Sequence, residues 1–297
     1  MSNFWGPLHL NSLDSTSRQY FDQGVKCYEA EEHDLAKERF TRALEANRTN
    51  FVAYQYLGFI AVHEDQPQTA IRNFDLARKF AEDSYHRALA LSHLARSYKA
   101  VGNLALAVQA STAATGAAPG YAKFWHEAAV YHVNLSQAAE AIRCLRRAVM
   151  IDKSYWSLIV ADATFDPIRD EVLALLDEMR TRLSQMAQDC LGASRRIVRY
   201  LERIDVTCTV PEVARKLNRW EEHYKSCPVF AYPDIMREAI GATKTEIKVA
   251  LGILSQGRSD GEREESKRTC NDSLRQFAQI EERLGASGFV WLKYSHV

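Results

Sequence analysis

Histidine is the residue type in this sequence best suited to bind a metal, and two histidine pairs lie close along the chain. His86 and His93 are seven residues apart and could share one face of a helix, whereas His126 and His132 are six apart and could not. A metal site needs further ligands, and no carboxylate or thiol joins the first pair at a ligand spacing. The histidines therefore predict no metal site.

Cysteine and the common catalytic motifs give no stronger signal for chemistry. A zinc knuckle or a redox pair needs two cysteines close together, and the six cysteines are all well separated. The sequence also lacks the glycine-rich phosphate loops, the zinc-protease motif and the nucleophile elbow of common enzymes. We therefore expect a protein that is not an enzyme and that needs no cofactor.

Arginine clusters provide the remaining chemistry, because a guanidinium group binds phosphate. Most of the second cluster lies outside the apolar face of its predicted helix, and such a distribution is typical of a solvated surface. The clusters still leave open an alternative function, that of a regulatory subunit of a nucleic-acid-processing or defence complex that contacts RNA or DNA. The two clusters are Arg143, Arg146 and Arg147, and Arg195, Arg196, Arg199 and Arg203.

The overall composition favours a folded protein of the cytoplasm. The 297 residues include 38 basic and 38 acidic side chains, so the formal net charge is zero and gives no general support for binding nucleic acid or a membrane surface. Apolar runs such as residues 57–62 and 249–254 are far shorter than the roughly 20 residues that span a bilayer. The chain starts without a basic region followed by an apolar stretch, so we expect no secretory signal.

An internal repeat organises the first half of the chain. Gly24 precedes Phe40 by the same distance as Gly58 precedes Phe74, and alanines recur around both pairs. Small residues at these positions would let two helices approach closely, and the large ones would fill the gap to the next pair of helices. Four copies begin at Ser17, Phe51, Ala88 and Ala122, with spacings of 34, 37 and 34 residues.

These copies resemble tetratricopeptide repeats (TPR), helix-turn-helix units of 34 residues with small and large residues at fixed positions and a terminal proline. Pro119 is the terminal proline of the third copy. The resemblance implies an all-α fold in which four units and a closing segment form a superhelix over residues 17–166. Residues 1–16 then form a separate N-terminal segment.

The resemblance also implies a concave groove lined by the first helix, helix A, of each unit. The implied groove is apolar and aromatic in the first two units and basic in the last two, which suits a partner peptide or helix with an apolar anchor and acidic residues. The alternative is that Phe21 and Phe59 are covered by the protein's own chain. The groove residues carried over are Phe21, Val25, Tyr28, Gln55, Phe59, His63, Arg96, Lys99, Lys123 and His126.

The second half of the chain predicts long helices packed as in a coiled coil. Apolar residues between 172 and 204 alternate in spacings of four and three, which is the heptad pattern. Helices are also expected near residues 209–224, 233–254 and 259–284, so residues 167–288 predict a coiled-coil-like bundle. The spacing does not tell whether the stripe pairs within one chain or forms a homo-oligomer. Its central members are Leu176, Met179, Leu183, Met186, Ile197 and Tyr200.

Residues 289–297 form an aromatic tail, which packs on the bundle or docks on a partner or neighbouring subunit. Together these observations predict a non-catalytic adaptor or scaffold. Its groove would bind a segment of another protein, and its C-terminal helices would serve oligomerisation or docking.

Overall fold

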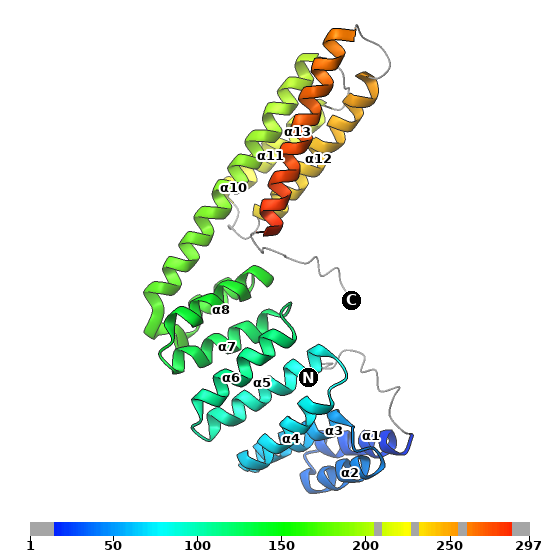
Figure 1. The fold of residues 1–297 in the computed structure, drawn as a ribbon, viewed down its shortest axis with the longest axis vertical. Helices are drawn as coiled ribbons and strands as arrows, with labels where there is room; N and C mark the ends of the chain where they lie inside the picture. Colours follow the sequence, from blue (N-terminus) through cyan, green and yellow to red (C-terminus); the bar gives the residue numbers. More distant parts are fainter. Residues whose placement is uncertain (1–14, 205–209, 227–231, 255–259, 287–297) are drawn as a thin grey trace. The chain divides into compact units, whose positions relative to one another are not determined.

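The computed structural model describes residues 15–204, 210–226, 232–254 and 260–286, which are helical with short connections and contain no strand (Figure 1). The prediction of an all-α fold is therefore confirmed. The chain divides into an N-terminal unit, residues 1–148 with 162–168, and a C-terminal unit, residues 149–161 with 169–297. Residues 1–14 and the predicted tail 289–297 lie outside the described residues.

The N-terminal unit is a succession of helix pairs, which we number as repeats one to four. Within each of the first three pairs the two helices pack extensively, and α4 also packs against α5. The helices are α1 (Ser15–Glu29) and α2 (His33–Ala46), α3 (Phe51–His63) and α4 (Pro67–Phe80), α5 (Ser84–Ala100) and α6 (Leu104–Ala117), and α7 (Ala122–Asn134) and α8 (Ala138–Ile151).

The repeated glycines of the first two repeats are required by close approach of their two helices. A β-carbon on Gly24 would lie 2.7 Å from Cε1 of Phe40, and one on Gly58 would lie 2.5 Å from Cε1 of Phe74. Both phenylalanines are buried in the core of the N-terminal unit. The sequence rule of a glycine followed by a phenylalanine thus describes one ring lying flat on one backbone.

The turn between the two helices of each repeat contains one residue in the left-handed backbone conformation. These residues have φ angles between 55° and 76°, and their spacings of 34, 37 and 34 residues equal those of the repeat starts. They are Glu31, Asp65, Gly102 and Ser136. Only one of the four is glycine, the residue that adopts this conformation without strain.

The longer spacing before the third repeat lengthens α5 at its N-terminus. This helix has 17 residues where α3 has 13, and the Asp83 side chain caps its start by accepting a hydrogen bond of 2.8 Å from the His86 backbone. The added turn packs in both directions, with the His86 ring 5.1 Å from that of Phe51 and the Tyr85 ring 4.8 Å from that of Tyr121. The insertion therefore adds contacts between repeats.

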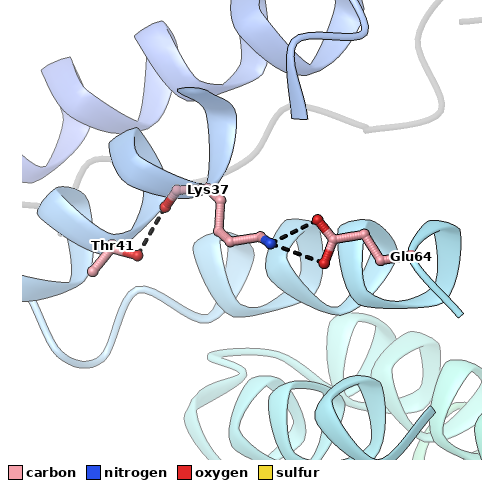
Figure 2. A network of polar contacts seen from close by, with 3 residues as sticks. All are labelled: Lys37, Thr41 and Glu64. Carbon is pink, nitrogen blue, oxygen red and sulfur yellow. Dashed lines mark hydrogen bonds and ion pairs between the residues drawn. The ribbon is translucent and has the colours of Figure 1, made fainter. Parts of the chain in front are cut away.

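A partly buried ion pair joins the first two repeats (Figure 2). The Nζ atom of Lys37, on α2, donates to both carboxylate oxygens of Glu64 at 2.6 and 2.8 Å. Glu64 follows the end of α3, and the Thr41 hydroxyl donates to the Lys37 carbonyl oxygen at 2.8 Å. The pair thus connects the second helix of repeat one to the first turn of repeat two.

The C-terminal unit contains α9 (Tyr155–Ala161) and a bundle with its own core. Side chains from all four bundle helices meet in that core, among them Cys190, Leu217, Met236 and Phe277. The bundle helices are α10 (Arg169–Ile204), α11 (Val210–Ser226), α12 (Tyr232–Leu254) and α13 (Asp260–Ala286), and a 3-10 helix, η2 (Ala163–Ile168), precedes them and belongs to the N-terminal unit.

The heptad stripe does not form an exposed oligomerisation surface, which corrects one of its two expected roles. Met186 and Ile197 belong to the bundle core, and the Tyr200 hydroxyl donates to Ser266 Oγ at 3.2 Å. These stripe residues pack against helices of the same chain. The remaining central members, Leu176, Met179 and Leu183, are at most 4% exposed.

Candidate functional site

A pocket of about 140 Å³ lies between α3 and α5, on the side where the two helices face each other. Its wall is mainly apolar, and one arginine lies at its edge. Helix α3 contributes Phe59 and Val62, and the start of α4 contributes Pro67. The residues that define its chemistry further are Phe74, His93 and Arg96.

Three rings form the floor of the pocket. The His93 imidazole stacks on Phe74 with a centroid distance of 5.2 Å and meets Phe59 edge-on at 4.8 Å. Burial, and to a lesser degree the charges of Arg96 and Lys123, lowers the pKa of His93 to about 3. The imidazole is therefore neutral near pH 7 and presents one donor and one acceptor nitrogen.

An ion pair orients the arginine beside the pocket. Arg96 Nη2 lies 3.7 Å from a carboxylate oxygen of Glu127 on α7, and the Ser92 hydroxyl donates to the other oxygen. The Arg96 side chain is still 60% exposed, so most of its guanidinium remains accessible. Sequence reasoning missed Glu127, because the charge of the neighbouring residues suggested an entirely basic wall.

The spatial repeat decides the family of the N-terminal unit. The glycine-on-phenylalanine contact of the first two repeats and the left-handed turn of all four recur with the 34, 37 and 34-residue spacing of the sequence. The first half of the chain is a TPR array. The predicted family is therefore confirmed for this half.

Solved structures give the same fold at low sequence identity. MamA from Desulfovibrio magneticus is 14% identical with a TM-score of 0.45, and the match covers 56% of this chain and 94% of that one. YrrB, described as a TPR protein with an unusual peptide-binding site, is 17% identical with a TM-score of 0.43 and coverage of 53% and 81%. TTC0263 from Thermus thermophilus is 20% identical with a TM-score of 0.41 and coverage of 55% and 89%. No protein-family model and no curated protein matches the chain.

Several predicted groove residues of repeats one and two are buried in the TPR array. Phe21 is 4% exposed and packs edge-on against Tyr56 at 5.7 Å, so it belongs to the core and is not an open groove residue. Gln55 is fully buried. Val25 and Tyr28 are partly buried against the same core cluster. Helical spacing placed these residues on the groove face, but it could not show what covers that face.

The other predicted groove residues divide between the pocket and more exposed positions. Phe59 and Arg96 contribute directly to the pocket. Lys99 is exposed one turn beyond Arg96 on the same helix. His63 is exposed at the end of α3, where its ring lies 4.3 Å from that of His33.

Two predicted groove residues on α7 are partly buried. The Lys123 ammonium lies 6.0 Å from the ring centre of Phe124. His126 Nε2 lies 3.6 Å from a carboxylate oxygen of Asp162, and its ring meets Phe165 at 5.4 Å. Burial lowers the pKa of His126, although Asp162 and Glu127 act in the opposite direction. His126 therefore contacts the segment that follows the last repeat.

The remaining chemical candidates are engaged in structural contacts. The His86 Nδ1 atom lies 2.5 Å from Asp83 Oδ2, and Arg143 pairs with Glu140 on its own helix. Arg195 donates to Asn218 Oδ1 at 3.2 Å. Burial raises the pKa of the Cys190 thiol to about 12, as expected for a residue that packs as a small apolar side chain.

Searches for metal and membrane features cover the described ranges alone. Within them, no three side chains of histidine, cysteine, aspartate or glutamate come together as metal ligands would. None of the described helices combines the length and apolar character needed to cross a membrane.

Proposed function

We propose that this protein is an adaptor or scaffold whose TPR array binds a segment of another protein at the pocket between α3 and α5. The observation that carries the proposal is the combination of an apolar floor with an accessible guanidinium at its edge. Such a site anchors one apolar side chain and selects the charge of its neighbour. The repeats supply the rigid frame that keeps the two features in register.

The pocket chemistry defines the expected ligand. A cavity of about 150 Å³ holds a benzene-sized group, so the observed volume of about 140 Å³ suits one apolar anchor side chain. Arg96 and Lys99 would bind acidic residues beside the anchor, and neutral His93 would hydrogen-bond to the peptide backbone. The partner is therefore a peptide or helix with one apolar anchor followed or preceded by acidic residues.

The C-terminal unit would serve as the second contact of the adaptor. Since the stripe packs inside its own chain, docking or homo-oligomerisation would use the outer faces of the bundle. We propose the cytoplasm as the site of action. Binding to nucleic acid is the weaker alternative, because Arg143 and Arg195 already have partners within the chain.

The test is to select peptides from a random display library with the full chain and to measure their affinity by calorimetry. Phe59→Ala should lower affinity at least tenfold by removing part of the floor. Arg96→Glu should lower it similarly and should eliminate the preference for acidic peptides. Arg87→Glu is the matched control on the same helix, because Arg87 is exposed outside the pocket, and it should stay within twofold. Equal affinity in all four proteins would contradict the proposal.

A further inference from the structure

Gln55 has a buried side-chain amide without a hydrogen-bond partner. The residue is fully buried, and neither Nε2 nor Oε1 is paired. Buried amides are nearly always hydrogen-bonded in folded proteins, because removing them from water without a partner is costly. The two free groups point to a ligand that supplies both a donor and an acceptor.

The neighbours of Gln55 establish the direction of its side chain. The Tyr54 ring stacks on Phe80 of α4 at 5.9 Å, and the Tyr56 ring stacks on Phe40 of α2 at 5.0 Å. Successive side chains on a helix differ by about 100° in direction. Gln55 therefore points between these two contacts, toward the concave side of the TPR array.

The same face of α3 is open farther along the helix. Phe59 and Val62 follow Gln55 by four and seven residues, so the three share one face, and the latter two line the pocket. Val62 is 52% exposed, whereas Gln55 is not exposed at all. Helix α5 repeats the contrast, with Ser92 buried and Arg96 one turn later 60% exposed. The concave face is thus covered along its N-terminal half and open along its C-terminal half.

The adjoining helices do not account for the cover over Gln55. Among the described helices, those that pack extensively on α3 are α2 and α4. They lie on the sides marked by Tyr56 and Tyr54. We propose that the segment preceding α1, residues 1–14, binds across the N-terminal half of the concave face as an intramolecular ligand, over Gln55.

The composition of this segment suits that role. An extended backbone offers N–H and C=O groups to the Gln55 amide, and Gly6-Pro7 disfavours a helix that would use those groups internally. The segment has few charges, and its apolar side chains would contact the buried face. These are Phe4, Trp5, Leu8, Leu10 and Leu13.

The segment is also long enough and joined at the right place. It continues directly into α1, the first helix of the same row as α3 and α5. Fourteen extended residues span roughly 46 Å, while packed helices lie about 10 Å apart. The segment therefore reaches both α3 and α5, and it leaves the pocket beside Arg96 available to a partner.

The test uses the full chain with the photo-crosslinking residue p-benzoylphenylalanine in place of Trp5. Irradiation at low protein concentration should give a crosslinked product of monomer mass, and peptide mapping should locate the link within residues 51–63 or 84–100. The same residue in place of exposed Tyr121 is the control and should give no link to α3. Gln55→Arg should reduce the Trp5-site yield at least fivefold, because the larger charged side chain displaces the segment, while Gln55→Leu should reduce it less.

Either of two results would overturn the inference. A product of dimer mass would show that the segment binds a second copy of the chain. A link elsewhere, or none in a protein whose circular dichroism is unchanged, would show that the face is covered in another way. Both results are independent of any partner, so the proposed adaptor function and this inference can fail separately.

Discussion

The stacking of His93 on Phe74 and Phe59 removes its imidazole from water at the floor of the pocket. Its pKa of about 3 in the folded chain lies below the ordinary value of 6.5, which applies to the unfolded chain. As the pH falls below 6.5, the unfolded chain binds a proton that the folded chain does not. The free energy of unfolding therefore decreases from pH 6.5 down to about 3, and this contribution is constant above pH 6.5.

Replacing this histidine should remove that part of the pH dependence. Between pH 7 and pH 5 the wild type should lose about 2 kcal/mol of stability through His93. His93→Phe should lose less by about that amount, and urea denaturation at both values measures the difference. His126, whose pKa is also lowered by burial, is present in both proteins and cancels. An equal loss in the two proteins would mean that His93 is protonated in the folded chain.

The close approach at Gly58 gives a second prediction for a single residue. Gly58→Ala should lower the free energy of unfolding by about 1–3 kcal/mol, because the new β-carbon would lie 2.5 Å from the Phe74 ring. Gly116→Ala is the control, since no heavy atom lies within 4 Å of its added β-carbon, and it should be neutral or slightly stabilising. Thermal unfolding of both variants tests the contrast. Similar effects at the two sites would argue against a steric role.

Single residues also show what sequence reasoning can and cannot reach. The glycine and phenylalanine pairs were predictable, because a repeated close contact leaves a repeated residue type. Phe59 and Arg96 were predictable from the family resemblance. The burial of Phe21 and Gln55 was not, because spacing along a helix defines a face and not what covers it. Glu127 follows a histidine and gives no signal until α5 and α7 are placed together.

The contact between the first two repeats shows how neighbouring helices are held together. Lys37 and Glu64 pair at 2.6 Å, but their side chains are 42% and 22% exposed, so water weakens the attraction. Phe40, on the same helix as Lys37, is fully buried against Tyr56 of α3. Apolar packing should therefore dominate this interface.

Paired substitutions on α2 should rank these two contributions. Lys37→Met should cost less than about 1 kcal/mol, whereas Phe40→Ala should cost about 3–5 kcal/mol by leaving a cavity. Urea denaturation with a common slope gives both values. A larger loss in Lys37→Met than in Phe40→Ala would show that the ion pair, and not the ring, holds the repeats together.

For the helices as elements, the sequence pattern predicted existence better than extent. The three-residue slip before the third repeat was visible, but not that it would become an extra turn of α5. That outcome depends on the Asp83 cap and on contacts with Phe51 and Tyr121, which belong to other repeats. The heptad stripe likewise predicted a packed face on α10, while the identity of its partners depends on how α11, α12 and α13 fold back.

The whole chain consists of two units with separate cores. The TPR array has its own buried clusters around Phe40 and Phe74, and the bundle of α10 to α13 has another around Met236. Separate cores allow local opening in one unit without loss of the other. Both units are predictable from the sequence as classes of fold, because a 34-residue repeat and a heptad stripe differ in period.

Hydrogen exchange followed by mass spectrometry should detect this independence. Met236→Ala removes a fully buried side chain and should reduce protection in α10 to α13 while leaving α1 to α6 unchanged. Phe74→Ala is the reciprocal variant and should reduce protection in α3 to α6 alone. If each substitution lowered protection throughout the chain, the two units would form one cooperative structure.

The left-handed turns have a consequence for engineering. Glu31 and Ser136 adopt a conformation that disfavours residues other than glycine by about 1–2 kcal/mol each. Neither residue lines the pocket, although Asp65 at the matching turn does. Glycine at these two turns would relieve the strain without changing the binding surface. The TPR array thus has a built-in route to a more heat-tolerant form.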